Sequence, residues 1–288
     1  MLARPCGRRG EYMIITTWNC CCGLTKEKTE KIIKEFPSDV YIIQECRDQD
    51  RYNLVDYFKF SNWYGDNTEY DEKTGKGDLG VGIFSNKYCI TLQYYHNKNI
   101  RYFIPFKIFN NEGNYIIYAV WTKKEKCNFP YIGQVIEGLK EKEYKDISES
   151  IVVGDFNTDI NYKNEKEYFT RMIDLFKSKD LKSCYHEYKK IEFGLDQEIK
   201  TYKNIGHVDY CFVPTKWIVL TVKTGEHTKW YQSQWKISEK TIDHIPMQVE
   251  LQINGLQLLQ PDNSFCHENC SRYARQFSRQ SLRAGITG

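Results

Sequence analysis

Residues 151–157 read Ile-Val-Val-Gly-Asp-Phe-Asn, and this stretch decides the fold that we expect for the chain. The apolar residues predict a buried strand that runs directly into a carboxylate. Gly154 permits a backbone conformation that larger residues avoid, and alternation along an extended chain directs Asp155 and Asn157 to the same side. The alternative is that Asp155 begins a turn and caps the next helix. Both interpretations stay open for this stretch taken alone.

Two other apolar segments also end in polar side chains. Asn19 follows the strand predicted from Met13, and Glu45 follows the buried strand predicted at residues 40–44. Amide and carboxylate oxygens are hard ligands of the kind that Mg²⁺ prefers. A helix cap or a turn is the alternative for each segment alone.

Two acidic residues stand where a charge needs a partner. Asp209 lies inside the otherwise apolar segment 208–213, where an unpaired carboxylate would be costly. Asp243 immediately precedes His244, before the last predicted strand. A carboxylate that holds one imidazole nitrogen fixes the tautomer and favours the protonated ring, which suits contact with a phosphate. Ordinary polar loop content is the alternative for this pair.

Strand and helix patterns alternate throughout the chain. Hairpins as well as crossovers favour mixed sheets covered by helices over a parallel barrel. The periodicity predicts helices at 25–36, 131–143 and 165–178, and strands at 13–19, 40–44, 80–85, 88–95, 102–109, 115–121, 150–154, 208–213, 217–222 and 245–251.

The composition is that of a single folded domain with two dissimilar ends. The chain has 288 residues, of which 41% are hydrophobic, and its 22 Tyr, 15 Phe and 6 Trp favour strand-rich structure. We therefore expect one domain at 13–252, an N-terminal extension at 1–12 and a C-terminal tail at 253–288, both poorly ordered. The net charge of +3 comes from arginines at these ends, so the domain itself is close to neutral.

The cysteines and the hydropathy indicate a cytoplasmic protein. The 11 Cys lie largely inside apparent strands, which is typical of reduced thiols, and we find neither a signal peptide nor a membrane span. Cys20, Cys21 and Cys22 follow Asn19, and a catalytic thiol there stays open although no base is apparent. Cys266, His267 and Cys270 lack the fourth ligand of a structural zinc site. No protein partner is indicated.

The motifs taken in order are far more specific than any one of them. The order is WN, QE, the stretch 80–85 (GVGIFS), GDFN, HVDY and DH. This order resembles the endonuclease/exonuclease/phosphatase superfamily, which includes DNase I, exonuclease III, inositol-polyphosphate 5-phosphatases and neutral sphingomyelinases. The resemblance covers residues 13–252. It implies a four-layer α/β/β/α sandwich, in which two mixed β-sheets pack face to face with helices outside, and a groove where the strand ends meet.

The resemblance also implies roles for the polar residues. Glu45 would hold Mg²⁺, or Mn²⁺ as an alternative, with Asn19 and Asp243 contributing to the metal site. Asp155 would orient or deprotonate the attacking water. Positioning and electrostatic stabilisation would supply most of the rate gain in such an in-line displacement at phosphorus.

The remaining residues would contact the substrate. By the same resemblance, Asn157 would bind a phosphate oxygen and His244, steadied by Asp243, would hydrogen-bond the scissile phosphate. Asp209 would complete the metal and phosphate network. Arg47, within a stretch that looks like the corresponding part of DNase I, is a further candidate for substrate binding.

One position departs from the family pattern. Many members carry a histidine where this chain has Trp121, so a candidate proton donor to the leaving group is missing. Trp121 would either stack on a flat group of the substrate or pack at the edge of the groove. Three functions stay open: a nuclease acting on nucleic acid, a phosphatase or phosphodiesterase of a small molecule or lipid head group, and a non-catalytic binding protein.

Overall fold

A computed structural model describes residues 11–65, 79–93, 96–97, 99–124, 131–142, 144, 147–231 and 242–253. Most of the two predicted tails lies outside these residues. At their margins, strand β1 (Glu11–Asn19) pairs with strand β12 (Met247–Ile253), so that Glu11 lies opposite Ile253 and Tyr12 opposite Gln252. The sheet therefore extends two residues before Met13 and one residue past the predicted end of the domain.

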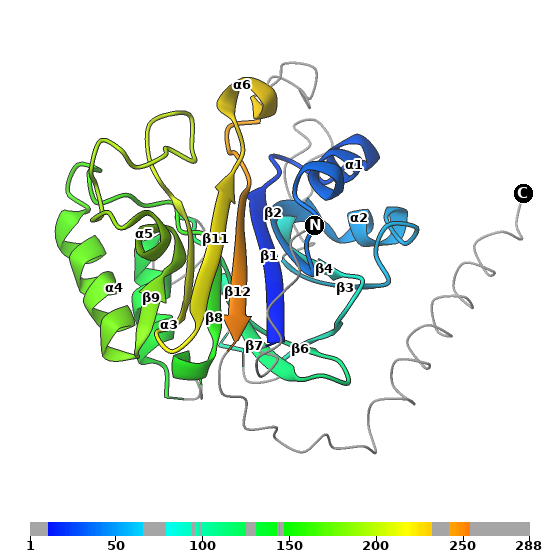
Figure 1. Cartoon of the computed structure of the whole chain (residues 1–288), viewed down its shortest axis with the longest axis horizontal. Coiled ribbons are helices and arrows are strands. Elements are labelled where there is room, and N and C mark those ends of the chain that lie inside the picture. Colours follow the sequence, from blue (N-terminus) through cyan, green and yellow to red (C-terminus); the bar gives the residue numbers. More distant parts are fainter. Residues whose placement is uncertain are drawn as a thin grey trace, which may run out of the picture.

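The first sheet has six strands in the order β11-β12-β1-β2-β4-β3. Its pairs are antiparallel except β1 with β2, which makes the sheet mixed. Figure 1 shows β11, β12 and β1 side by side. The strands not yet bounded are β2 (Val40–Arg47), β3 (Phe60–Gly65), β4 (Leu79–Ser85) and β11 (Ile218–Thr224).

The second sheet repeats this plan with the order β5-β6-β7-β8-β10-β9. Only β7 and β8 are parallel, and β8 has neighbours on both sides. The strands are β5 (Cys89–Leu92), β6 (Phe103–Phe109), β7 (Asn114–Trp121), β8 (Ile151–Asp155), β9 (Leu181–Ser183) and β10 (Asp209–Pro214).

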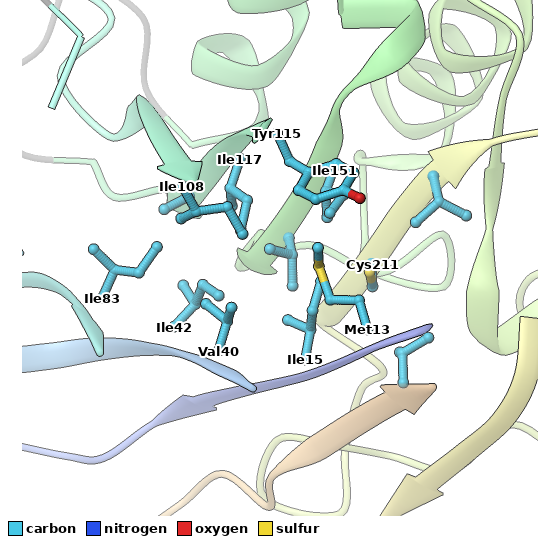
Figure 2. Close-up of a cluster of buried hydrophobic side chains, with 14 of the residues drawn as sticks. Met13, Ile15, Val40, Ile42, Ile83, Ile108, Tyr115, Ile117, Ile151 and Cys211 are labelled. Atoms are coloured by element: carbon cyan, nitrogen blue, oxygen red, sulfur yellow. The ribbon is translucent and has the colours of Figure 1, made fainter. Parts of the chain in front are cut away.

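The space between the two sheets is the main core. Alternate residues of each strand face inward, as the period of two requires. In Figure 2, side chains of the first sheet, such as Met13 and Ile42, lie opposite side chains of the second, such as Ile117 and Ile151. Because the inner faces are apolar along most of their length, polar side chains at the strand ends are exceptions.

Helices cover the outer faces. In α3 (Ile132–Lys140) and α4 (Lys166–Ser178), buried apolar residues recur with helical spacing and pack on the second sheet. Helix α1 (Lys26–Glu35) packs on the first sheet, together with Trp230 of α6 (His227–Trp230). Figure 1 places α1 and α2 on one side of the molecule and α4 and α5 on the other. The remaining elements are α2 (Asp48–Asn53), α5 (Cys184–Lys189) and the 3₁₀ turn η1 (Ile147–Glu149).

The predicted four-layer sandwich is confirmed, although several short elements were not predicted. Strands β3 and β9 and helices α2, α5 and α6 are additions to the predicted set. Strand β5 spans Cys89–Leu92 of the strand predicted at 88–95, and residues 94 and 95 lie outside the described residues. No helix among the described residues is long and apolar enough to cross a membrane.

Candidate active site

Polar side chains gather at one end of the space between the sheets. In β1 and β8, Asn19 and Asp155 continue the inward-facing series of apolar residues that fills the core. Asp209 opens β10 on the same inward series and lies opposite Asp155 in the register of the second sheet. Three strand ends therefore deliver polar groups to one buried place.

The backbone at Gly154 explains how Asp155 reaches this position. Gly154 has a φ of +148°, and a Cβ atom built there would lie 2.0 Å from the carbonyl oxygen of Val120 on β7. Only glycine fits this close approach of two parallel strands. The close approach lets β8 run between β7 and β10 as far as Asp155, which ends the strand and has no exposed surface.

The carboxylate of Asp155 is held from three sides. The backbone N–H of Asn157 donates to Oδ1 over 2.8 Å, and the side-chain amides of Asn19 and Asn157 donate to Oδ2 over 3.1 and 3.0 Å. Burial raises the pKa of Asp155 to about 7, although the imidazole of His244 and these hydrogen bonds act in the opposite direction. An acid of this strength can exchange a proton near neutral pH.

His244 lies between two buried carboxylates. Its Nδ1 is 3.0 Å from Oδ2 of Asp209, and its Nε2 is 3.9 Å from Oδ2 of Asp155. Burial alone would lower the pKa of His244, but the charges of Asp209 and Asp155 outweigh that effect and raise it to about 10. The ring is therefore an imidazolium at neutral pH.

The partner of His244 differs from the one that we expected. Asp243, its neighbour in sequence, forms an ion pair with Lys203 at 3.4 Å, whereas Asp209 on β10 holds the imidazole. Neighbouring residues of an extended segment point in opposite directions, so the side chain of Asp243 leaves the ring that it was predicted to steady. The expectation that Asp209 needs a partner is met by the imidazolium.

Sequence analysis did not find Thr201, which supports the same pair. Its hydroxyl oxygen accepts hydrogen bonds from the backbone N–H groups of Val208 and Asp209, over 3.0 and 3.2 Å. Its carbonyl oxygen accepts one from the N–H of Ile245, the residue after His244. A single residue thus ties Asp209 to the segment that carries His244, and no sequence motif marks it.

Glu45 and Asn19 form a second corner of the site. A bulge between Gln44 and Cys46 in the pairing of β2 with β4 leaves Glu45 with a φ of 55°, a left-handed conformation that redirects its side chain. Its Oε1 accepts a hydrogen bond from the amide of Asn19 over 3.3 Å. Because the same amide nitrogen donates to Asp155, Asn19 bridges the carboxylates of the two sheets.

Both amide hydrogens of Asn157 are directed at protein oxygens. The nitrogen Nδ2 lies 2.8 Å from the carbonyl oxygen of Thr122 and 3.0 Å from Oδ2 of Asp155. The left-handed backbone of Asn157, with a φ of 48°, brings its N–H and its side chain to the same carboxylate. This arrangement orients Asp155 and leaves no amide hydrogen of Asn157 for a phosphate oxygen.

Two other predicted residues stand at the margin of the site. Trp121 is 4% exposed, packs its ring at 4.9 Å from that of Tyr102, and carries the ammonium of Lys123 at 4.0 Å from its own ring centre. This geometry is that of packing, the second of the two alternatives for Trp121. Arg47 precedes α2, where its backbone N–H donates to Asp50, beside the loop that contains Gly23.

The donor set favours a hard divalent cation near Glu45, Asn19 and Asp155. Two carboxylates converge there on the amide nitrogen of Asn19, and carboxylate oxygens suit Mg²⁺ and Mn²⁺. The oxygen of Asn19, which the sequence offered as a ligand, accepts a hydrogen bond from the backbone N–H of Cys21 instead. Asp209 Oδ1 is a buried acceptor without a hydrogen bond among the described residues. Asp155, Asp209 and His244 also lie close enough to ligate one ion. In the structure these three residues form an ion-pair network, in which the two nitrogens of His244 face Asp209 and Asp155.

Comparison with known proteins identifies the family of the chain. A family model described as "Endonuclease/Exonuclease/phosphatase family" matches residues 16–245. No curated protein matches the sequence.

Solved structures show the same fold at low sequence identity. An endonuclease/exonuclease/phosphatase from Beutenbergia cavernae has a TM-score of 0.57 and 13% identity, over 86% of this chain and 72% of that one. A 3'-5' exonuclease from Neisseria meningitidis has a TM-score of 0.54 and 17% sequence identity, over 82% of this chain and 98% of that one. An AP endonuclease from Archaeoglobus fulgidus has a TM-score of 0.53 and 12% sequence identity, over 82% of this chain and 98% of that one.

Proposed function

The chain belongs to the endonuclease/exonuclease/phosphatase family, and from this membership we propose that it is a divalent-metal-dependent phosphodiesterase that cleaves nucleic acid. Members of this family hydrolyse phosphoester bonds. The observation that carries the proposal is the buried meeting of Asn19, Asp155, Asp209 and His244 at one end of the space between the sheets. Burying this many polar groups away from water is costly without a function that uses them.

His244 supplies a positive charge at the phosphate. Its Nδ1–H is directed at Asp209, so Nε2–H is the donor left for a phosphate oxygen. The raised pKa keeps the ring protonated through the neutral range, which lets it offset the negative charge that builds up in the transition state.

Asp155 is the group that orients the attacking water and accepts its proton. The two asparagines that donate to its oxygens fix the direction of the carboxylate. A pKa near neutral matches the task, because a base works best when its pKa lies close to the working pH. In this scheme Asn157 acts through Asp155, whereas the family resemblance implied that it binds a phosphate oxygen.

Glu45 and Asp155 would hold Mg²⁺ through their carboxylates, and Asn19, whose amide nitrogen donates to both, would position them. When bound, such an ion polarises a phosphoryl oxygen and stabilises the charge that develops there. The left-handed conformation of Glu45 and the bridging amide of Asn19 keep the carboxylates in place before the ion arrives. We assign Asp243 and Arg47 to the border of the site, where Asp243 and its partner Lys203 would meet the substrate.

The choice of nucleic acid as substrate is supported by the solved structures that are named as an exonuclease and an AP endonuclease. A specific observation favours a second candidate, a small phosphoester. The domain is close to neutral, whereas duplex-binding proteins usually carry a strong basic surface.

Hydrolysis of a mixed panel tests the proposal. The panel contains supercoiled plasmid, single-stranded DNA, RNA, bis-p-nitrophenyl phosphate and p-nitrophenyl phosphate, each with Mg²⁺ or EDTA. We expect cleavage of a polymer that EDTA abolishes and that Asp155→Asn lowers by about 10²- to 10⁴-fold. Asp174→Asn, at an exposed aspartate of α4, is the matched control and should retain full activity. Turnover of small esters alone would select the second candidate, and silence throughout would favour a binding protein.

A further inference from the structure

Two adjacent cysteines lie beside Glu45. The thiol sulfurs of Cys21 and Cys22 and a carboxylate oxygen of Glu45 all lie within 4.8 Å of one another. The exposed fractions of the two cysteines are 5% and 6%, and Glu45 is partly exposed, so the group lies just beneath the surface. The proposed phosphodiester chemistry uses neither thiol.

The backbone that carries both thiols has an uncommon conformation. Cys21 and Cys22 have φ values of 52° and 60°, so two consecutive residues with side chains adopt the left-handed conformation. Such residues are uncommon outside glycine, asparagine and aspartate, and they persist only where the surroundings hold them. An unusual backbone of this kind, at a cluster of reactive groups, points to a binding function.

The surroundings do hold this loop. Buried Lys28 donates from Nζ to the carbonyl oxygens of Cys20, Cys21 and Gly23, over 2.6, 2.9 and 2.8 Å. The backbone N–H of Cys22 donates to Oε2 of Glu45 over 3.2 Å, and that of Gly23 donates to the carbonyl oxygen of Glu45 over 2.8 Å. The two thiols and the carboxylate are thus held together before any ligand binds.

We propose that Cys21, Cys22 and Glu45 form a binding site for a thiophilic divalent cation, Zn²⁺ in the first place. Two thiolates, a carboxylate and a water molecule complete the four-coordinate shell that Zn²⁺ favours, and thiolate ligands select it over Mg²⁺. Each coordinated thiol releases its proton to solvent on binding. The two carboxylate oxygens of Glu45 face different partners, since Oε2 accepts from the backbone N–H of Cys22 and Oε1 accepts from the side chain of Asn19, which also donates to Asp155.

The site shares Glu45 with the proposed Mg²⁺ site, so the two ions compete. Zn²⁺ bound to the thiols would withdraw the carboxylate that the activating ion needs, and hydrolysis would fall. This inhibition rests on the proposed phosphodiesterase function, whereas the binding of Zn²⁺ does not.

Cadmium absorbance tests the binding directly on the full, reduced chain. The probe is Cd²⁺, followed by the ultraviolet charge-transfer band of cadmium thiolate, with Zn²⁺ measured by competition against a chromophoric chelator. The background carries Cys266→Ser and Cys270→Ser, which removes a second cluster of potential ligands. We expect one ion for each chain, and a loss of affinity on the order of 100-fold or more in Cys21→Ser and in Cys22→Ser.

Matched variants make the result decisive. Cys89→Ser, which alters a partly exposed cysteine on β5, should bind the ion as the parent does. Glu45→Gln should weaken binding while it keeps the charge-transfer band, and circular dichroism checks that each variant is folded. An unchanged band in both Cys21→Ser and Cys22→Ser, or no band in the parent, would overturn the proposal.

A second arm separates this proposal from the proposed function. Zn²⁺ should suppress Mg²⁺-dependent hydrolysis in the parent, and higher Mg²⁺ concentrations should relieve the effect. If the parent hydrolyses nothing but binds Cd²⁺ through the thiols, the proposed function fails and the ion site stands. If hydrolysis occurs and Zn²⁺ inhibits the parent and the Cys21→Ser, Cys22→Ser double variant equally, competition through Glu45 is overturned, and if the cadmium band is also unchanged in the double variant, the ion site fails while the proposed function stands.

Discussion

His244 and Asp209 form a buried ion pair, with Nδ1 of the imidazole 3.0 Å from Oδ2 of the carboxylate. The exposed fractions of the two residues are 2% and 0%. The negative charge of Asp209 is therefore the main influence that keeps the imidazole protonated, and several measurable properties of the protein depend on this pair.

Replacement of Asp209 should move the alkaline limit of activity. His244 must carry its proton to donate to a phosphate, so the rate should fall as pH rises through the pKa of the imidazolium, about 10. Asp209→Asn removes the largest influence that raises this pKa, and the alkaline limb should move toward neutral pH by about one unit or more. Asp243→Asn should move it less. A larger shift in Asp243→Asn would restore Asp243 as the partner of His244.

The same pKa predicts how stability depends on pH in EDTA. The folded pKa of His244 lies above the ordinary value of 6.5, so its stabilising contribution is complete below pH 6.5 and is lost as pH rises toward 10. Burial lowers the pKa of His186 and His207, so these two residues change the free energy of unfolding with pH only below about pH 6.5. Between pH 7 and 8 the free energy of unfolding should therefore fall, by about 1.4 kcal/mol per pH unit from His244, and the remaining ionisation of Asp155, whose pKa is raised to about 7, adds to the fall in the same direction. Urea unfolding at several pH values measures it, and a flat profile would contradict the buried imidazolium.

The fold was predictable because its signals are local. The apolar runs in β1, β7 and β8 reflect strands buried on both faces, and the helical spacing of apolar residues in α3 and α4 reflects the side of each helix that faces a core. Strand β3 escaped prediction because it is an edge strand whose residues are all half-buried, so its sequence shows no alternation. Helix α2 has six residues, too few for a periodic pattern.

The site was predictable as a set of residues but not as a set of contacts. The strand-end positions of Asn19 and Asp155 follow from alternation, and the sequence correctly required a partner for Asp209. The identity of that partner depends on the antiparallel register that sets β10 against β8 and on the path of the chain before β12, which no local pattern contains. Sequence adjacency wrongly favoured Asp243, because it ignores the alternation that separates neighbouring side chains.

Gly154 should be the least replaceable glycine of the site. In Gly154→Ala the added Cβ would meet the carbonyl oxygen of Val120, and the φ of +148° is strained for alanine. We expect a loss of about 3 kcal/mol or more in the free energy of unfolding, together with reduced activity as Asp155 shifts. Gly133→Ala, within helix α3, should instead be neutral or stabilising by about 0.5–1 kcal/mol. Equal stability of the two variants in urea would mean that the close approach of β7 and β8 imposes no constraint.

Glu45 should control how much Mg²⁺ the protein needs. Glu45→Gln removes one of the two carboxylates that converge on the amide of Asn19, so the Mg²⁺ concentration for half-maximal hydrolysis should rise by roughly 10- to 100-fold. Asn19→Ala should act in the same direction, because it releases both carboxylates from their bridge. Asp48→Asn is the matched control, since Asp48 pairs with Arg51 on α2 and contributes no ligand. If Glu45→Gln lowers the maximal rate but leaves the Mg²⁺ requirement unchanged, then Glu45 contacts the substrate and the ion lies elsewhere.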